Sequence, residues 1–382
     1  MQYMWLFAIL MKKFRTDREA GSGRDLACHR ASFRNTTGGL NCADARGTNT
    51  REHVVVKAVL CKGWGEPSDL AVEEAEAPSP DAGAVRVSVR AAGVNFADNL
   101  MVAGKYQFKP PFPFSPGFEA SGIVAEVGLG VRDFKPGDRV MAALPHGGFA
   151  EEVVCPAMNA VSIPDGMDFP SAAAFPVAYG TVHLALIHRA HLKEGQTLLV
   201  HGAAGNVGRA AVEVGKILGA TVIATGGSPE SLRAALCRGA DHLVHYGEED
   251  IRDSVLEITE GRGADVVFDP VGGDVFDASL RCVAWKGKIL VIGFASGRIP
   301  DAPAWRILIR NCAVVGTDWG GYVRREPETV RAATAEALRW YEEGALDPRP
   351  SHEFSLEEAA DILEAQAARE IVGKAVLTVG AT

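Results

Sequence analysis

The chain has 382 residues, is 47% hydrophobic and carries a formal net charge of −9. Its length favours two domains over one, because single hydrophobic cores rarely grow beyond about 250–300 residues. The acidic balance disfavours nucleic acid as a partner, and no apolar run approaches the roughly 20 residues of a membrane span, so no membrane partner is expected. Seven scattered cysteines without a C-x-x-C pair are typical of a reducing compartment, and we expect a cytoplasmic protein.

Residues 1–53 differ in composition from the rest of the chain. They hold nine Lys and Arg residues against five Asp and Glu residues. No hydrophobic period persists between Met11 and Arg51, which is typical of a disordered segment. We therefore expect residues 1–53 to be a disordered or dispensable extension.

Residues 54–178 contain short apolar stretches separated by Gly and Pro. Val85, Val87 and Val89 alternate with polar residues, which is the period of a half-buried strand. This pattern predicts an irregular, mostly antiparallel, β-rich domain.

From residue 179 to 316 the pattern changes to strands and helices in alternation, which indicates a doubly wound parallel sheet. Helices are then expected at 328–344 and 356–368, and the final "GKAVLTV" reads as a strand that rejoins the first domain. The fold class is α/β, with the site expected in a cleft between the two domains. The strands expected in the parallel sheet are 197–201, 221–225, 242–245, 265–269, 288–293 and 312–316.

A small-residue turn connects the first of these strands to a helix, in "LLVHGAAGNVGRAAVEVGKILGATVIATGG" (198–227). A small first residue allows the tight turn, Gly205 lets the backbone approach a pyrophosphate, and Gly208 lets the helix pack on the sheet. The helix N-terminus then offers N–H groups to the anion. We predict a nucleotide site here; the alternative is a turn that is merely tight. The predicted contacts are Ala203, Ala204, Gly205, Asn206, Val207 and Gly208.

The order of a β-rich domain, a Rossmann unit and a short return resembles the medium-chain dehydrogenase/reductase superfamily, in particular its zinc-free NADPH:quinone oxidoreductase (zeta-crystallin-like) branch. The resemblance implies a GroES-like catalytic domain at 54–178, a Rossmann NADP-binding domain at 179–316 and a return segment at 317–382 that completes the catalytic domain. The motifs that carry it are "AAGVNFADNLMVAGKY" (91–106), "PFSPGFEASGIVAEVG" (113–128), "KPGDRV" (135–140), "HGAAGNVG" (201–208) and "GADHLVHYGEED" (239–250).

Zinc-dependent relatives share this architecture, so the ligand positions matter. Asn95 stands where such an enzyme would have its first Cys, and Phe118 stands where it would have the His before Glu119. No Cys lies near 175–181, and no cluster of four cysteines is present. Because zinc needs three or four N, S or O ligands, we expect no metal.

The resemblance implies NADPH as the cofactor. The second strand of the nucleotide unit ends in "VIATGGSPESLR", without the acid that takes a ribose 2′-hydroxyl in NAD sites, and Gly227 and Ser228 leave room and a hydroxyl for a phosphate. Ser231 replaces the Lys that the family tends to use, and Arg233 is expected to compensate. Tyr246 matches the family Tyr at the 2′-phosphate, with ordinary packing as the alternative. Further cofactor contacts implied by the resemblance are Thr181, Val271, Phe294 and Lys374.

Without a Lewis acid, a bound nicotinamide can reduce only an acceptor that is already electrophilic, such as a quinone or an enone. The family would place Asn95 at the nicotinamide ribose or the acceptor oxygen; the alternative is a turn-forming residue. Asp98 is expected to orient this loop. Tyr106 matches a residue of the nicotinamide pocket that donates a proton in related 2-enoyl thioester reductases, and loop packing is its alternative.

Two other functions stay open. One is a 2-enoyl thioester (enoyl-CoA/ACP) reductase, and the other is a non-catalytic nucleotide-binding protein. The stretch 313–321 also resembles a sheet edge that the family uses for dimerisation, so a homodimer is expected.

Overall fold

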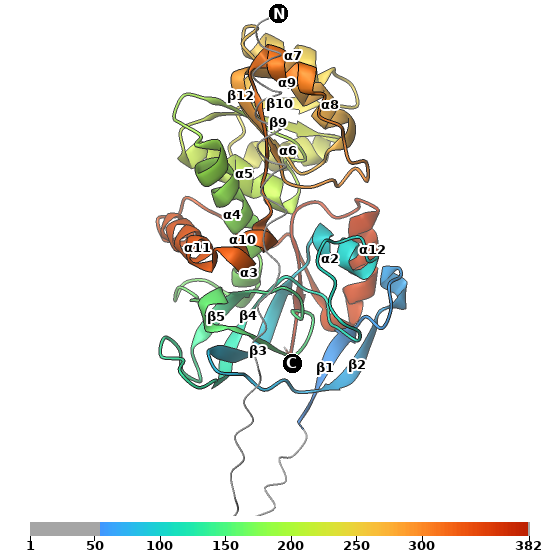
Figure 1. Cartoon of the computed structure of the whole chain (residues 1–382), viewed down its shortest axis with the longest axis vertical. Helices are drawn as coiled ribbons and strands as arrows, with labels where there is room; N and C mark the ends of the chain where they lie inside the picture. Colours follow the sequence, from blue (N-terminus) through green and yellow to red (C-terminus); the bar gives the residue numbers. More distant parts are fainter. Residues whose placement is uncertain (1–53, 381–382) are drawn as a thin grey trace, which may run out of the picture. The chain divides into compact units, whose positions relative to one another are not determined.

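The computed structural model describes residues 54–380, and the prediction for residues 1–53 lies outside this range. Two large β-sheets organise the described chain, one near each end of the view in Figure 1. The predicted β-rich unit followed by a doubly wound parallel sheet is confirmed. No helix within residues 54–380 is long and apolar enough to cross a membrane.

The first sheet has the strand order β14-β15-β3-β4-β5-β7, and β6 also pairs with β3. Val85, Val87 and Val89 of β3 are buried, so the alternation in the sequence faces the core. A separate hairpin joins β1 (Val55–Leu60) and β2 (Ala71–Glu76). The bounds of the sheet strands are β3 Ala84–Gly93, β4 Glu119–Val127, β5 Arg139–Ala143, β6 Glu152–Pro156, β7 Ala160–Ser162, β14 His352–Ser355 and β15 Ala375–Thr378.

The second sheet is parallel throughout, with the order β10-β9-β8-β11-β12-β13. Its central strand β8 is buried along its whole length, as a sheet covered on both faces requires. The strands are β8 Thr197–Val200, β9 Thr221–Gly226, β10 His242–His245, β11 Ala264–Asp269, β12 Val283–Val291 and β13 Ala313–Gly316. The connecting helices are α5 Asn206–Ile217, α6 Pro229–Cys237, α7 Ile251–Ile258, α8 Gly273–Cys282 and α9 Ala304–Arg310.

All six strands predicted for this sheet are present, and one begins several residues earlier than predicted. β12 starts at Val283 rather than at 288. Its pairing with β11 is irregular near this start, and Lys286 has a positive φ of 65°. Trp285 and Lys286 are exposed, so they separate the buried Val283 and Ala284 from the apolar run on which the prediction of this strand rests.

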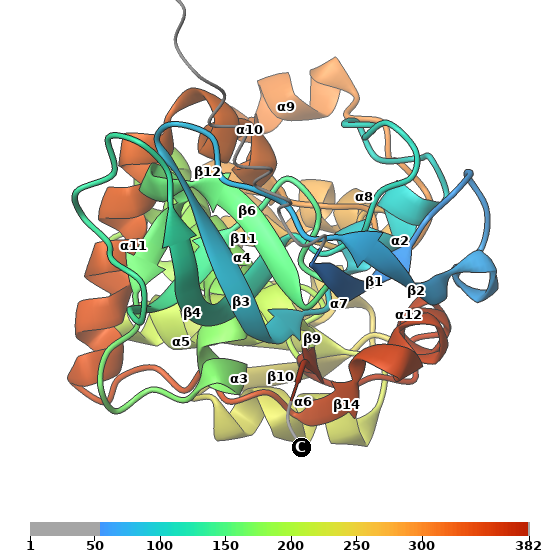
Figure 2. The same ribbon diagram turned by 90° about the horizontal axis from the view of Figure 1, so that it is seen from below.

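The remaining helices lie between and beside the two sheets. α11 packs on α4, and its Ala337 and Leu338 belong to the same hydrophobic cluster as Leu198 of β8. β14 and β15 pair with the first sheet, and η4 and α12 pack on it. Trp319 of α10 and Val330 of α11 also cluster with Ala143 of β5, so this part of the chain contacts both sheets. Figure 2 shows α12 beside α2, with α11 on the other side of β3 and β4. These elements are α2 Phe96–Val102, α3 Phe169–Ala173, α4 Pro176–His183, the π-helix η3 Leu184–Ala190, α10 Trp319–Arg325, α11 Pro327–Glu342, η4 Leu356–Glu358 and α12 Ala359–Ala367.

Candidate active site

Asp98 shapes the loop that connects β3 to α2. Its Oδ2 accepts the Asn95 N–H at 2.8 Å, and its Oδ1 accepts the Gly117 N–H at 3.0 Å. The side chain is fully buried, and this burial raises the pKa of Asp98 to about 7, although the two hydrogen bonds and the charge of Lys374 oppose the rise. Asp98 thus connects the start of α2 to Gly117, which lies just before β4. Its hydrogen bonds go to the backbone of these two segments.

The side-chain amide of Asn95 lies at the centre of a buried polar network. Its Nδ2 donates to Glu119 Oε1 at 2.9 Å and to Gly93 O at 3.2 Å. Its Oδ1 accepts from Asn206 Nδ2 and from Lys374 Nζ, each at 3.0 Å. Because an amide offers two donors and two acceptor sites, Asn95 has no hydrogen-bonding capacity left for an acceptor oxygen.

Lys374 provides the positive charge of this network. Its ammonium donates to Glu119 Oε1 at 2.5 Å, to Asn95 Oδ1 and to Val94 O at 3.0 Å. The three N–H groups are therefore all used, and the side chain is only 3% exposed. In this arrangement all three N–H groups of the ammonium are used by the protein itself, and the predicted cofactor contact at Lys374 stays a prediction.

Glu119 completes the network and was not predicted as a functional residue. Its Oε2 accepts the Val177 N–H at 2.8 Å, at the start of α4. The side chain is fully buried. Lys374 lies 255 residues further along the chain, so no local pattern in the sequence connects the two residues.

The described residues do not fit a zinc centre. Asn95 and Phe118 occupy two of the expected ligand positions, and Glu119 Oε1 is already bound to the Lys374 ammonium. Within residues 54–380 no group of three or more His, Cys, Asp or Glu residues could hold a metal ion. A metal at this position would require the release of a buried ion pair and would still lack N or S ligands.

The predicted nucleotide turn connects β8 to α5 and has the geometry of a phosphate-binding turn. A Cβ on Gly208 would lie 2.2 Å from Gly202 O, so only glycine lets the helix pack this closely. A Cβ on Gly205 would meet only Gly202 O, at 3.3 Å, and otherwise points into open space. The turn therefore fits a dinucleotide pyrophosphate on its Gly205 side, at the N-terminus of α5.

The turn also touches the catalytic domain. Gly205 forms a parallel β-bridge with Gly373, next to Lys374. Asn206, the first residue of α5, donates to Asn95 as described above. The nucleotide turn and the buried network are thus directly bonded to each other.

The residues predicted for the 2′-phosphate come together at the end of β9. Ser228 is the N-cap of α6, and its Oγ accepts the Ser231 N–H at 3.2 Å. Tyr246 lies against Gly227, where a Cβ would come within 2.4 Å of its hydroxyl oxygen. Arg233 is exposed on the same helix. The cluster is uncharged except for Arg233. A 2′-phosphate is attracted by this positive charge, whereas an acidic residue at this position would repel it.

The other predicted cofactor contacts lie around the turn. The Val271 side chain comes within 3.1 Å of the Cβ position of Gly202, and Phe294 comes within 3.0 Å of that of Gly272. Thr181 is buried in α4. Val271 therefore borders the nucleotide turn directly, whereas Phe294 lies on the loop that follows β12 and contacts the loop after β11 at Gly272.

Tyr106 lies apart from the buried network. Its ring packs edge-on against Phe118, with centroids 5.0 Å apart, and burial raises its pKa to about 12. Its hydroxyl oxygen is 3.3 Å from the Cβ position of Gly320. No hydrogen-bond partner for this hydroxyl is present among the described residues. The Tyr106 hydroxyl is therefore protonated and donates no hydrogen bond to any described residue.

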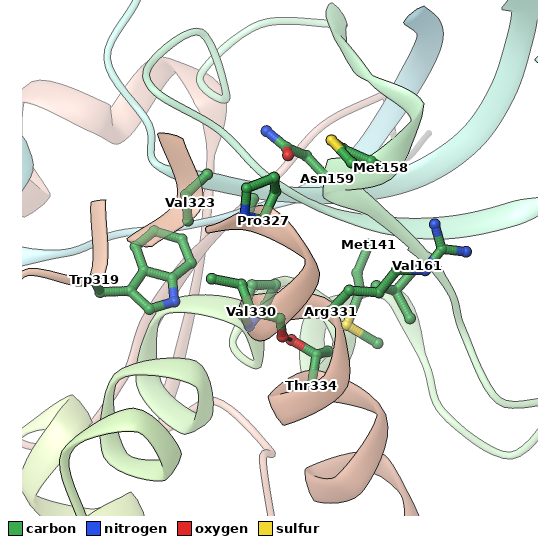
Figure 3. Close-up of a pocket in the computed structure, with 12 residues that line it drawn as sticks. Met141, Met158, Asn159, Val161, Trp319, Val323, Pro327, Val330, Arg331 and Thr334 are labelled. Carbon is green, nitrogen blue, oxygen red and sulfur yellow. Dashed lines mark hydrogen bonds between the residues drawn. The ribbon is translucent and has the colours of Figure 1, made fainter. Parts of the chain in front are cut away.

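A hollow lies between β5 and the helices α10 and α11 (Figure 3), with about 370 Å³ of empty space that includes open solvent. Its wall is largely apolar, and none of the predicted site residues lines it. Trp319 borders it, with an indole N–H that is buried beside Gly180 and has no partner in the described chain. This hollow is therefore separate from the predicted site. The labelled lining residues are Met141, Met158, Asn159, Val161, Trp319, Val323, Pro327, Val330, Arg331 and Thr334.

Comparisons with known proteins match both domains. Residues 81–165 match the family described as alcohol dehydrogenase GroES-like domain, and residues 206–339 match zinc-binding dehydrogenase. Quinone oxidoreductase-like protein 2 homolog of Nematostella vectensis is 40% identical over 325 residues, which cover 84% of this chain and 88% of the relative.

Solved structures give the same result. A quinone oxidoreductase from Pseudomonas syringae has a TM-score of 0.80 and 32% identity, covering 85% of this chain and 99% of that chain. A mycobacterial protein solved in complex with NADPH has a TM-score of 0.80 and 30% identity, covering 84% and 99%.

The fold and the turn define a medium-chain dehydrogenase/reductase, with a GroES-like domain and a Rossmann domain, as predicted. The chain belongs to this family, and within it to the quinone oxidoreductases. It is accordingly an oxidoreductase that uses a nicotinamide cofactor.

Proposed function

We propose that the protein is an NADPH-dependent reductase of quinones or other α,β-unsaturated carbonyls, and that it works without a metal. The observation that carries this proposal is the ion pair of Lys374 with Glu119, which already uses the one carboxylate at the expected ligand positions. Asn95 and Phe118 stand at two of the other positions, and no group of three or more His, Cys, Asp or Glu residues within 54–380 could hold a metal ion. An acceptor must then be electrophilic by itself, as quinones and enones are.

The choice of NADPH over NADH is supported by the end of β9. No acid follows this strand to bind a 2′-hydroxyl or to repel a phosphate. Gly227, Ser228 and Tyr246 border the space, and Arg233 supplies the only positive charge among these four residues. A relative of known structure has been solved with NADPH, which agrees with this choice.

The chain's own residues bind and orient the reactants in this proposal. The nucleotide turn holds the pyrophosphate at Gly205 and the N-terminus of α5. Asn95, fixed by Lys374 and Glu119, positions Asn206 at the same turn. When bound, the reduced nicotinamide supplies a hydride. Tyr106 keeps its proton at neutral pH, because its pKa lies near 12, and it can donate this proton to a developing oxyanion.

One observation favours a second candidate function, a 2-enoyl thioester reductase. A protonated tyrosine without a hydrogen-bond partner can donate its proton to the basic enolate that forms in this reaction. The anion formed from a quinone is less basic, so a positioned proton donor contributes less to its reduction. The two functions share the cofactor and the fold. They differ in the acceptor and in what the Tyr106 hydroxyl contributes.

The test is a spectroscopic assay of NADPH oxidation against quinones, enones and enoyl thioesters, with NADH in parallel. We expect the highest kcat/KM with a quinone or an enone, no dependence on chelators and no stoichiometric zinc in the purified protein. Oxidation of NADPH by enoyl thioesters alone would favour the second candidate. Absence of turnover with every acceptor would favour a non-catalytic nucleotide-binding protein.

We also propose that two copies pair through β13 as a homodimer. β13 is an edge of the parallel sheet, and an unpaired edge exposes backbone N–H and C=O groups that proteins usually cover. The preceding helix α9 exposes Trp305, Leu308 and Ile309 next to this edge. Light scattering after size-exclusion chromatography tests the proposal, and Leu308→Glu with Ile309→Glu should yield monomers if it is correct.

A further inference from the structure

Arg324 carries hydrogen-bond donors that the described chain leaves free. Its guanidinium, 39% exposed, donates no hydrogen bond to any residue between 54 and 380. Its nearest acid is Asp318, with Nη2 and Oδ2 3.9 Å apart, which is beyond hydrogen-bond distance. The guanidinium is therefore ion-paired with Asp318 but forms no hydrogen bond to it, and its five donors have no acceptor among residues 54–380.

This guanidinium shares its surroundings with Tyr106. Arg324 Nη1 and the Tyr106 hydroxyl oxygen are each 3.3 Å from the Cβ position of Gly320. Because glycine has no side chain, the space between the two donors is not filled by residue 320. Asp318 Oδ1 lies 3.6 Å from the same Cβ position, so one carboxylate also borders this space. The charged group and the predicted proton donor thus face the same small volume.

An aromatic surface lies below the charge. The Phe108 ring centroid is 5.9 Å from Arg324 Cζ, and the ring of His146 stacks on Phe108 at 6.2 Å with an angle of 19°. Burial lowers the pKa of His146, so this ring is neutral at neutral pH. Lys109, the next cation on the loop, lies over the ring of Trp64 instead. The positive charge beside Tyr106 therefore comes from Arg324.

We infer that Arg324 is a specificity-determining residue, and that the acceptor is an aromatic or conjugated carbonyl compound that carries an acidic substituent. The ring of such a compound would lie on Phe108, its acidic group would accept from the Arg324 guanidinium, and its carbonyl would approach Tyr106. A guanidinium binds a carboxylate or sulfonate through two parallel hydrogen bonds. Asp318 competes for the same charge, but its long contact forms no hydrogen bond that would be lost. This inference rests on the proposed function and specifies its substrate class.

The experiment compares ortho-naphthoquinone with its ring-sulfonated derivative in the purified full chain. We expect Arg324→Met to lower the ratio of kcat/KM for the sulfonated to the neutral quinone by about tenfold, because a half-exposed charge-assisted hydrogen bond is lost. The ratio cancels the intrinsic reactivity of each quinone. Arg324→Lys keeps the charge but cannot form two parallel hydrogen bonds, so its ratio should lie between those of wild type and Arg324→Met. Arg325→Met removes the next exposed arginine of α10 and should leave the ratio within about twofold of wild type.

Two outcomes overturn the inference. One is a ratio of kcat/KM values in Arg324→Met that equals the wild-type ratio. The other is a fall of this ratio in Arg325→Met as large as in Arg324→Met, which would mean that only the overall positive charge of the surface attracts the sulfonate. If no quinone is turned over, the proposed function fails, and calorimetric binding of naphthalene sulfonate still decides the inference. Weaker binding by Arg324→Met than by wild type supports it, whereas equal binding, or none by wild type, rejects it.

Discussion

Lys374 and Glu119 form an ion pair of 2.5 Å in the interior, with side chains that are 3% and 0% exposed. The pair joins the residue before β15 to the first residue of β4, and it holds Asn95 between them. Removing two charges from water is costly, and the remaining hydrogen bonds to Val94 and Val177 compensate for part of this cost. Each buried charge therefore depends on the other for its compensation.

The first prediction concerns this dependence. Lys374→Met leaves the Glu119 carboxylate buried without a counter-charge, and we expect a loss of about 3–5 kcal/mol in the free energy of unfolding. Adding Glu119→Gln removes the orphan charge and should recover much of the loss. Denaturant unfolding of the two single variants and the double variant forms the double-mutant cycle that measures it.

Arg86→Met is the matched control, because Arg86 pairs with Glu152 on the same sheet but is more exposed. Arg86→Met should therefore lose less free energy of unfolding than Lys374→Met. If the double variant is no more stable than Lys374→Met, the two charges do not depend on each other. If the double variant recovers its stability but binds NADPH more weakly than wild type, the role of the network is to position the nucleotide turn.

The second prediction concerns pH. Asp98 has a pKa near 7 in the folded chain against 3.8 ordinarily, so its protonated form stabilises the fold. This contribution is fully present below about pH 4 and is lost as the pH rises through 7, by up to about 4 kcal/mol. Asp98→Asn loses a hydrogen bond to a backbone N–H, which gives a constant offset. Its free energy of unfolding should therefore approach that of wild type as the pH rises from 5 to 8, and parallel curves would contradict the prediction.

The fold was largely predictable because its signals are local. The strand at Thr197–Val200, the small-residue turn and the amphipathic α5 lie within one short stretch of chain. The exceptions have local causes as well. Exposed Trp285 and Lys286 interrupt β12 after its start at Val283, and α11 packs on the parallel-sheet domain as well as on β5.

The candidate site was predicted only in part, because its key contacts are long-range. Asn95 and Asn206 were named separately, but nothing in the sequence shows that their amides are bonded. Glu119 was considered as a metal ligand and Lys374 as a cofactor contact, while their mutual ion pair depends on the pairing of β15 with β3. Arg324 was not predicted, since an exposed arginine in a short helix has no distinguishing pattern.

The third prediction separates the two glycines of the nucleotide turn. Gly205→Val places its side chain on the open side of the turn, so we expect a nearly unchanged melting temperature and a loss of NADPH binding of at least about tenfold. Gly208→Val meets the backbone at Gly202 and should destabilise the fold itself. Fluorescence titration and thermal unfolding measure the two effects. Normal NADPH affinity in Gly205→Val would mean that the turn does not bind the pyrophosphate.

The fourth prediction concerns the choice of nicotinamide. Asp is as good an N-cap as Ser, so Ser228→Asp should preserve α6 and its hydrogen bond to Ser231. The new carboxylate repels a 2′-phosphate, and we expect NADPH affinity to fall by about tenfold or more with little change for NADH. Ser228→Asn is the neutral control with nearly the same shape. Equal losses for both cofactors in Ser228→Asp would reject this position for the phosphate.

The last prediction concerns Tyr106 and decides between the two enzyme functions. Tyr106→Phe removes the hydroxyl but keeps the ring that packs on Phe118, so stability should change little. Reduction of a quinone gives a delocalised anion that water protonates readily, and we expect a loss below about tenfold in kcat. An enoyl thioester gives a far more basic enolate, for which a positioned acid contributes about 10²–10⁴ in rate. Because its pKa is near 12, the tyrosine stays protonated from pH 6 to 9, and the effect of the substitution should not vary over this range. A loss of 10² or more with an enoyl thioester that wild type reduces faster than any quinone would identify the protein as an enoyl thioester reductase.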